Sequence, residues 1–246
     1  MNQKNYKLEI QYDGTDYAGW QFQPNVVSVQ QKIEECLSKI LNKDTTIIGS
    51  GRTDSGVHAF GQVANFNTEK ELDNFKFTYA LNGLLPDDIS IKNLKEVNPE
   101  FHSRFDATRR SYYYFISKYK NPFYKKYSYF FKGWRNYDFW RMNKTAKILL
   151  GEKDFTSLAK KKTEVKNKVC DLREIQIRET KNFVIFYVEA NRFLHGMVRA
   201  TVGTLLESAK HDYSPDYLLD VLKAQNRDVA GRAVPAEGLF LYKVKY

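Results

Sequence analysis

The chain has 246 residues, a formal net charge of +10, and 17 Tyr, 17 Phe and 3 Trp residues. A chain of this length can bury a hydrophobic core without disulfides or bound metal. The excess of positive charge favours a polyanionic partner such as nucleic acid, and aromatic side chains offer surfaces on which unpaired bases stack. Composition alone agrees equally well with a basic surface over an aromatic core.

Cysteine, histidine and hydropathy patterns narrow the class further. Cys36 and Cys170 lie far apart, and the four His residues have no metal-ligand spacing, so neither a disulfide framework nor a zinc site is predicted. The longest clean apolar run, at residues 183–188, is too short to span a bilayer, and the first residues lack a secretory h-region. We therefore expect a cytoplasmic protein with no membrane segment and no metal site.

In chain order, alternating residues predict a first strand at 6–12. Ser28 and Gln31 form a candidate capping box for a helix from Val29 to Leu41. Further elements of the first half are expected as follows: a strand at 46–48, a strand at 62–66, a helix at 75–82 capped by Gly83, and a strand at 89–91.

The second half continues the mixture of strands and helices. Its expected elements are a strand at 110–117, a helix at 137–150 stopped by Gly151, a hairpin of strands 175–179 and 183–190 with its turn at 181–182, a helix at 193–209, a helix starting at Pro215 with Ser214 as its cap, and a strand at 240–246. This pattern indicates a mixed α+β or α/β fold. We expect two similar lobes, residues 1–99 and 100–246, each an antiparallel or mixed sheet with helices on one face.

The most informative segment is the loop at residues 49–59, which lies between two predicted strands. Three glycines in eight residues permit positive φ angles and close backbone approach, and between them lie the Arg52 guanidinium and the Asp54 carboxylate. The lysine and hydroxyl pair of a phosphate-binding loop are missing. The residues alone leave two possibilities open: a presented carboxylate, or a glycine-rich turn with a surface Arg–Asp pair.

The segment Gly51-Arg-Thr-Asp-Ser-Gly-Val-His-Ala59 resembles the signature of the TruA family of tRNA pseudouridine synthases. Five other segments resemble family motifs in the same order: YDGTDYAGWQ at 12–21, FHSRFDA at 101–107 followed by the tyrosines at 112–114, GEKDFTS at 151–157, FLHGMVR at 193–199 with Val202-Gly203, and EGLFL at 237–241. The chain departs from the usual motifs at Glu152-Lys153 and at Ser55, which affects fine substrate contacts more than the reaction.

The resemblance implies a pseudouridine synthase fold with an active-site cleft between the lobes, and a defined chemistry. The N-glycosidic bond of a uridine is broken, the base rotates, and it is rejoined through C5, at conventional tRNA positions 38, 39 or 40 of the anticodon arm. Asp54 corresponds to the family's catalytic nucleophile, Arg199 to an arginine that keeps the carboxylate ionised, and Tyr112 to a tyrosine that stacks on the base. Whether Asp54 attacks C1′, attacks C6 or assists a glycal route stays open. The family also acts as a homodimer and needs no metal or cofactor, so the resemblance implies both for this chain.

Other basic residues are candidate contacts to tRNA. Arg52, Arg109 and Arg110 are candidate RNA-binding residues, and the resemblance places Leu241 beside the catalytic carboxylate. The run Lys160–Lys162, with Lys166 and Lys168, is a second basic cluster or simply a solvated loop. Two alternatives remain, a non-catalytic tRNA-binding or chaperone protein on the same fold and a general basic interaction protein. Replacement of Asp54 by Ala separates them, since only an enzyme needs the carboxylate.

Overall fold

A computed structural model describes residues 3–161 and 165–246 of the chain. The backbone divides into two compact units, the first comprising residues up to Thr108 together with Leu241–Tyr246, and the second comprising Arg109–Phe240. This division differs from lobes at 1–99 and 100–246. Ser103 donates its N–H to Asn65 Oδ1 at 3.0 Å, and Tyr246 Oη donates to Ser103 O at 2.8 Å. These two bonds connect residues 100–108 and 241–246 to the first unit.

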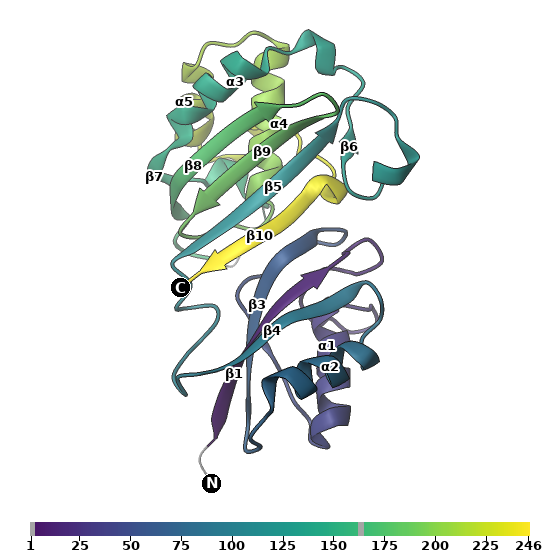
Figure 1. Cartoon of the computed structure of the whole chain (residues 1–246). Coiled ribbons are helices and arrows are strands. Elements are labelled where there is room, and N and C mark those ends of the chain that lie inside the picture. The colour runs from purple at the N-terminus through teal and green to yellow at the C-terminus, as the bar shows by residue number, and fades with distance from the viewer. Residues whose placement is uncertain (1–2, 162–164) are drawn as a thin grey trace. The chain divides into compact units, whose positions relative to one another are not determined.

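The first unit is built on an antiparallel sheet. Strand β1 (Lys4–Tyr12) pairs with both β3 (His58–Thr68) and β4 (Ile89–Val97), and the short strand β2 (Ile48–Gly49) pairs with β3. Figure 1 shows β4, β1 and β3 side by side, with α1 (Val29–Leu41) and α2 (Asn74–Leu84) on one face. The strand side chains that face the helices form the core of this unit, as alternation predicted.

Helix α1 agrees with the sequence prediction at both ends. The Ser28 side chain accepts from the Gln31 N–H at 3.3 Å, and Asn42 ends the helix in a left-handed conformation with φ of 53°. Gln31 directs its side chain to Glu35 instead of back to Ser28, so only half of the predicted capping box forms. The buried face consists of Val29, Ile33, Cys36, Leu37 and Leu41.

The end of α2 corrects the prediction for Gly83. Asp73 caps the start of α2 by accepting from the Lys76 N–H at 2.9 Å, but the helix runs through Gly83 to Leu84. It ends at Leu85, which is extended because it precedes Pro86. The proline, and not the glycine, stops this helix.

The second unit contains a four-stranded antiparallel sheet in the order β5 (Arg109–Ser117), β9 (Phe183–Ala190), β8 (Val169–Glu179) and β7 (Gly151–Asp154). A short strand β6 (Tyr129–Phe130) pairs with β5 in parallel. The strands β8 and β9 form the predicted hairpin. The last strand, β10 (Leu239–Lys245), begins within the second unit and continues into the first from Leu241 onward.

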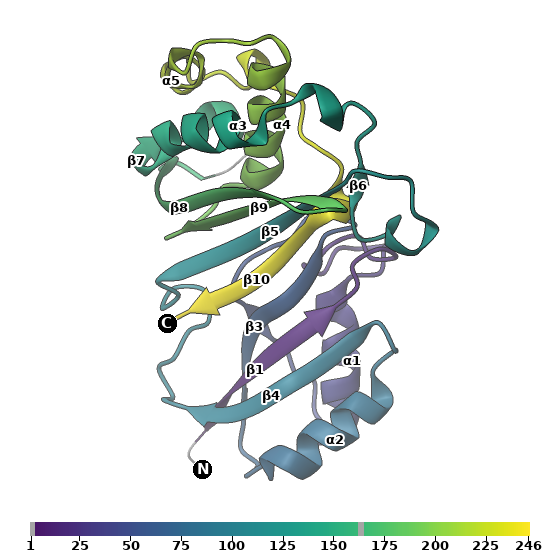
Figure 2. The ribbon, with the colours of Figure 1, turned by 45° about the horizontal axis from the view of Figure 1, so that its top comes forward.

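Helices α3 (Phe139–Ala146), α4 (Met197–Lys210) and α5 (Asp216–Lys223) lie on one side of this sheet (Figure 2). The predicted helix at 137–150 is shorter and ends in a 3₁₀ turn, before Gly151 at φ +88°. Helix α4 starts four residues later than predicted because Gly196, at φ +74°, breaks the helical path. Helix α5 begins at Asp216, and the structure gives Pro215 the N-cap position with no capping side chain.

Single-turn 3₁₀ helices occupy several connections; they span Pro122–Tyr124 (η1), Trp134–Asn136 (η2), Lys147–Leu149 (η3), Thr156–Leu158 (η4), Arg227–Val229 (η5) and Ala236–Gly238 (η6). Strands and helices are mixed in both units, which confirms the predicted α+β class. Within the described residues, no helix is both long enough and apolar enough to cross a bilayer.

Candidate active site

The Asp54 loop, residues 50–57, leaves β2 and returns to β3. Hydrogen bonds to β3 hold its first half: Ser50 N–H donates to Val63 O at 2.7 Å, and Ser50 Oγ donates to Gln62 Oε1 at 2.6 Å. The amide of Gln62 completes the arrangement by donating to Gly51 O at 3.0 Å. Asp54 is then presented half-buried. A loop fixed in this way holds its carboxylate in position before the substrate binds, so that binding does not have to order the loop.

The second half of the Asp54 loop packs on the segment after β1, which carries the YDGTDYAGWQ motif. The Trp20 N–H donates to Thr53 O at 3.2 Å, and the hydroxyls of Tyr12 and Thr53 are 2.9 Å apart. Ser55 Oγ donates to the Tyr17 carbonyl at 3.1 Å. Two motifs that the sequence presents separately therefore form one substructure, with Asp54 between the bonded residues.

Two glycines of that motif are required by this packing. A Cβ on Gly14 would lie 2.0 Å from Val57 O, and a Cβ on Gly19 would lie 2.4 Å from Thr53 O. Gly19 also has φ of +98°, which side chains disfavour. Because both clashes involve backbone atoms of the Asp54 loop, any larger residue displaces the loop itself.

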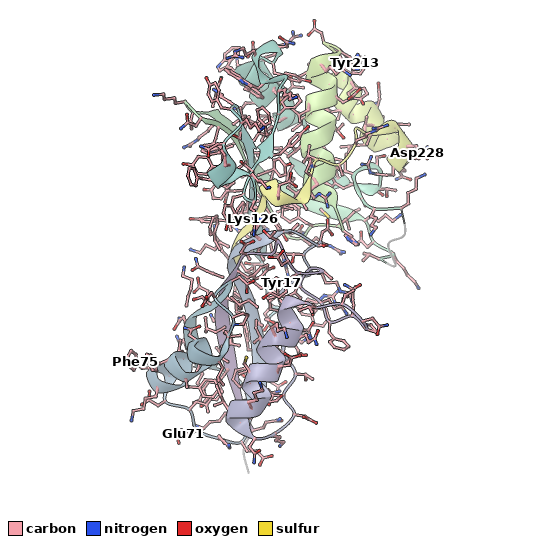
Figure 3. The ribbon with its side chains drawn as sticks, turned by 90° about the vertical axis from the view of Figure 1, so that its right-hand side faces the viewer. Tyr17, Glu71, Phe75, Lys126, Tyr213 and Asp228 are labelled. Atoms are coloured by element: carbon pink, nitrogen blue, oxygen red, sulfur yellow. The ribbon has the colours of Figure 1, made fainter. Side chains whose placement is uncertain are left out.

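Two buried polar pairs support the same substructure. His58 Nδ1 lies 3.1 Å from both Asp13 Oδ1 and the Gly14 nitrogen, and its ring is almost wholly buried, so His58 supports the packing of this segment. Tyr17, labelled in Figure 3, donates to Asp88 Oδ1 at 2.6 Å. Burial raises the pKa of Tyr17 above its usual value, and the Asp88 carboxylate adds to this shift, so the phenol stays a donor at neutral pH.

On β5, the tyrosines alternate as expected. Tyr112 and Tyr114 are buried on one face, and Tyr113 lies opposite Tyr187 on the other face, with ring centroids 5.2 Å apart. Phe193 meets Tyr112 edge-on, with centroids 5.1 Å apart and an interplanar angle of 86°. Only 8% of Tyr112 is exposed, so stacking on a base requires its surroundings to open.

Tyr114 is a structural member of this row. Its hydroxyl donates to Pro235 O at 2.9 Å, and the side chain is fully buried. Burial raises its pKa far above the usual value; Glu237 adds to the shift and Arg199 opposes it. Tyr114 therefore remains a neutral donor that anchors the segment after α5 to β5.

Arg199 lies half-buried in the first turns of α4. Its Nε donates to Val234 O at 2.7 Å, and the Val234 N–H donates back to Arg199 O at 3.2 Å. A Cβ on Gly203 would lie 1.8 Å from Arg232 O, so the segment 231–235 approaches the helix through this glycine. Leu194, Val198, Val202 and Leu205 are buried, and His195 lies before the first residue of the helix.

The two arginines of β5 differ in their surroundings. Arg109 Nη1 lies 3.2 Å from Oε1 of Glu189, a carboxylate that is almost fully buried, whereas the arginine is about half exposed. Arg110 Nη1 donates to Asn191 O at 3.0 Å. Both side chains are therefore oriented by β9 and the residues that follow it.

The lysine cluster divides in the structure. Lys160 donates its N–H to His195 O at 2.9 Å, and Lys161 forms an exposed ion pair with Asp228 at 2.8 Å. Lys162 lies outside the described residues, whereas Lys166 and Lys168 are described beyond it, Lys166 exposed and Lys168 half-buried.

Each unit holds its own part of the predicted residue set. Asp54, the exposed Arg52 and the buried Leu241 belong to the first unit; Tyr112, Arg109, Arg110 and Arg199 belong to the second. Sequence reasoning missed the supporting residues, above all the segment 231–235 behind Arg199 and Phe193 beside Tyr112. The available signal was the pair Gly203 and Gly231. A Cβ on Gly203 would clash with the backbone of residue 232, and a Cβ on Gly231 would clash with the backbone of residue 203.

A family model described as tRNA pseudouridine synthase matches residues 9–106 and 145–246, which include the Asp54 loop and α4. The chain belongs to the tRNA pseudouridine synthase family. Members of this family are isomerases that convert uridine to pseudouridine in tRNA, which confirms the reaction class predicted from the sequence motifs.

Named relatives agree along the full length. The tRNA pseudouridine synthase A of Bacteroides fragilis is 43% identical, covering 100% of this chain and 98% of its own. That of Clostridium acetobutylicum is 42% identical, covering 99% and 100%. A crystal structure of a Cbf5-Nop10-Gar1 complex contains a chain that matches at a TM-score of 0.35 and 14% identity, over 82% of this chain and 54% of its own, a likeness too weak for any conclusion.

Proposed function

We propose that this protein isomerises uridine to pseudouridine in the anticodon stem-loop of tRNA, at conventional positions 38, 39 or 40, with Asp54 as the nucleophile. The observation that carries the proposal is the bracing of the Asp54 loop. Ser50, Gly51 and Thr53, the residues around the carboxylate, hydrogen-bond to β3, to the last residue of β1 or to the segment after β1. A nucleophilic carboxylate gains most when it is held in place before the substrate arrives.

The remaining candidate residues receive roles consistent with their surroundings. Arg199 opposes protonation of the nucleophile, and its bond to Val234 fixes the position of its Nε. Tyr112 stacks on the displaced base, for which stacking supplies about 1–3 kcal/mol. Leu241 supplies apolar packing beside the reacting groups, and Arg52 contacts the RNA from its exposed position. Arg109 and Arg110 contact phosphates next to Tyr112.

We further propose a homodimer that binds one tRNA across both subunits, in the cytoplasm, with no metal or cofactor. The resemblance of six motifs supports the dimer. Its check is sedimentation of the protein with and without tRNA, where a single protomer in both conditions contradicts the proposal.

The test uses Asp54→Asn and Asp54→Ala beside the wild-type protein, with Asp44→Asn as a control because Asp44 is exposed and lies outside the loop. Each protein is incubated with a tRNA transcript, and pseudouridine is mapped along the whole tRNA by chemical probing. We expect product from the wild type and from Asp44→Asn, none from either Asp54 variant, and unchanged tRNA affinity in all four.

The outcomes separate the alternatives. Product from the Asp54 variants moves the nucleophile to another residue. Tight binding without product from the wild type favours a non-catalytic tRNA-binding or chaperone protein. Product at a different arm of the tRNA contradicts the proposed positions and leaves the reaction standing.

A further inference from the structure

Residues 118–137, named here the aromatic–basic loop, connect β5 to α3 in the second unit. The loop contains six Lys or Arg and nine aromatic residues but no Asp or Glu. It also lies between the two stretches that the family model matches, which end at residue 106 and resume at 145. Family membership therefore explains neither its charge nor its aromatic content.

The loop presents its aromatic side chains to solvent. Residues 122–127 are exposed without interruption, and Phe123 keeps 84% of its surface accessible. Lys125 and Lys126 belong to the same exposed run, and Tyr119 and Lys120 are exposed just before it. Figures 1 and 2 show this segment extending away from the sheet beside β6, and Figure 3 labels Lys126 within it. An apolar ring held in water among cations is a feature of binding surfaces.

The base of the loop is fixed, so the exposed side chains have a defined support. Lys118 is buried, lies 2.5 Å from Glu179 Oε1, and places its ammonium 4.5 Å from the centroid of the Trp134 ring. Asn121 Oδ1 accepts from the Phe123 N–H at 2.9 Å. Ser128 Oγ donates to Tyr124 O at 2.9 Å and closes the turn. A preorganised loop loses little conformational freedom on binding.

The combination of charge and flat rings selects one class of partner. Cations alone suit any anionic surface, but rings placed next to them suit unpaired nucleotides, whose bases stack while the phosphates contact lysine. A second copy of the chain carries the same net charge of +10, so long-range electrostatics disfavour a contact between this loop and another copy.

We propose that the aromatic–basic loop is an RNA-binding surface, in which Phe123 stacks on an unpaired nucleotide of the substrate and Lys125 and Lys126 contact its phosphates. This inference rests on the proposed function, because it assigns the loop to the same tRNA. It adds to the Asp54, Tyr112 and Arg199 set a contact that binds RNA without touching the reacting atoms.

The test compares Phe123→Ala and the double variant Lys125→Ala/Lys126→Ala with wild type, in tRNA binding at several salt concentrations. We expect Phe123→Ala to raise Kd about tenfold at every salt concentration, as loss of one stacked base implies. The double variant should raise Kd and reduce the slope of log Kd against log salt by about 0.7–0.9 for each lost phosphate contact.

Matched controls come from α2, where Phe75 is 81% exposed and Lys76 is its exposed neighbour. Phe75→Ala and Lys76→Ala should leave both Kd and salt slope unchanged. Phe123→Trp should bind as wild type, because indole stacks as well as phenyl. An RNA duplex without unpaired nucleotides should show no loss with Phe123→Ala, and an equal loss on duplex and tRNA overturns the stacking assignment.

Pseudouridine formation by the wild type separates this proposal from the proposed function. If the wild type isomerises uridine and both loop variants bind tRNA as tightly as it does, the loop proposal is wrong and the function stands. If the loop variants lose RNA affinity while the wild type makes no pseudouridine, the loop proposal stands and the function falls. If the loop variants convert a dimer to a monomer and leave tRNA affinity unchanged, the loop is a subunit interface and the loop proposal is wrong.

Discussion

Arg199 and Val234 are joined by two hydrogen bonds that run in opposite directions, one from the arginine Nε to the valine carbonyl at 2.7 Å and one from the valine N–H to the arginine carbonyl at 3.2 Å. The next residue, Pro235, accepts from Tyr114 through its own carbonyl at 2.9 Å. Consecutive carbonyls of one extended segment thus connect α4 to β5. The orientation of Arg199 depends on a segment that no sequence motif had pointed to.

Arg199→Lys keeps the positive charge but lacks the Nε donor that reaches Val234. We expect the free energy of unfolding to fall by about 1–3 kcal/mol, since the carbonyl loses a charged partner, and the single-turnover rate to fall as well. Urea unfolding and single-turnover pseudouridine formation measure both. Arg173→Lys is the control, because its pair with Asp171 is partly exposed and worth about 0–1 kcal/mol. A wild-type rate in Arg199→Lys assigns the role of Arg199 to charge alone.

Tyr114→Phe should change stability, whereas Tyr112→Phe should change the reaction rate. Loss of the Tyr114 hydroxyl leaves Pro235 O without that donor and should lower stability by about 0.5–1.5 kcal/mol with the rate at saturating tRNA nearly unchanged. Tyr112→Phe keeps the ring for stacking but removes the phenol, which the family resemblance implies takes part in proton handling at C5, so it should slow the single-turnover rate. Thermal unfolding and single-turnover kinetics on both variants decide; a slower rate in Tyr114→Phe alone would exchange their roles.

Gly19→Ala should displace the Asp54 loop, because its Cβ would lie 2.4 Å from Thr53 O at a φ of +98°. We expect a loss of more than about 1 kcal/mol in the free energy of unfolding and a larger loss of activity. Gly83→Ala is the matched control, since no atom lies within 4 Å of its Cβ position inside α2. There alanine should stabilise the protein by about 0.5–1 kcal/mol. Equal melting temperatures for the two variants contradict the packing argument.

Stability should decline at high pH through Tyr187. Burial raises the pKa of its phenol to about 12 from a usual value of 10.0, while a hydrogen bond from Ser111 acts against the rise and the Glu189 carboxylate adds to it. The folded state therefore holds its proton longer than the unfolded chain. The contribution is complete below about pH 10 and is lost as the pH rises through about 12. Urea midpoints between these values should fall less steeply in Tyr187→Phe than in wild type or in the exposed control Tyr79→Phe.

Local sequence signals predicted helices and strands well where nearby residues determine the ends of the element. Ser28 and a left-handed Asn42 bound α1, and the β8–β9 hairpin follows from alternation and a turn. Errors arose where two signals competed. Gly83 suggested a helix end, but Pro86 decides it, and the pattern from Phe193 onward suggested a longer α4 than Gly196 permits.

The candidate site divides in the same way. Motifs pointed to Asp54, Arg199 and Tyr112, because chemistry restricts those residue types. The residues that hold them were not predictable from spacing, since Thr53 meets Tyr12 and Arg199 meets Val234 across long sequence separations. Only the glycines of the motifs indicated these long-range contacts, because a side chain at those positions would clash with the backbone of another segment.

The division of the chain has a consequence for synthesis on the ribosome. Thr108 donates its N–H to Lys245 O at 2.9 Å, and Tyr246 hydrogen-bonds to Ser103 O, so the first unit incorporates residues translated after the whole second unit. Until Leu241–Tyr246 are translated, the edge of β3 that pairs with β10 has the two-residue strand β2 as a partner but lacks β10. All residues of the second unit are translated before Leu241. A polypeptide truncated before residue 241 therefore contains every residue of the second unit but lacks the last strand residues of the first.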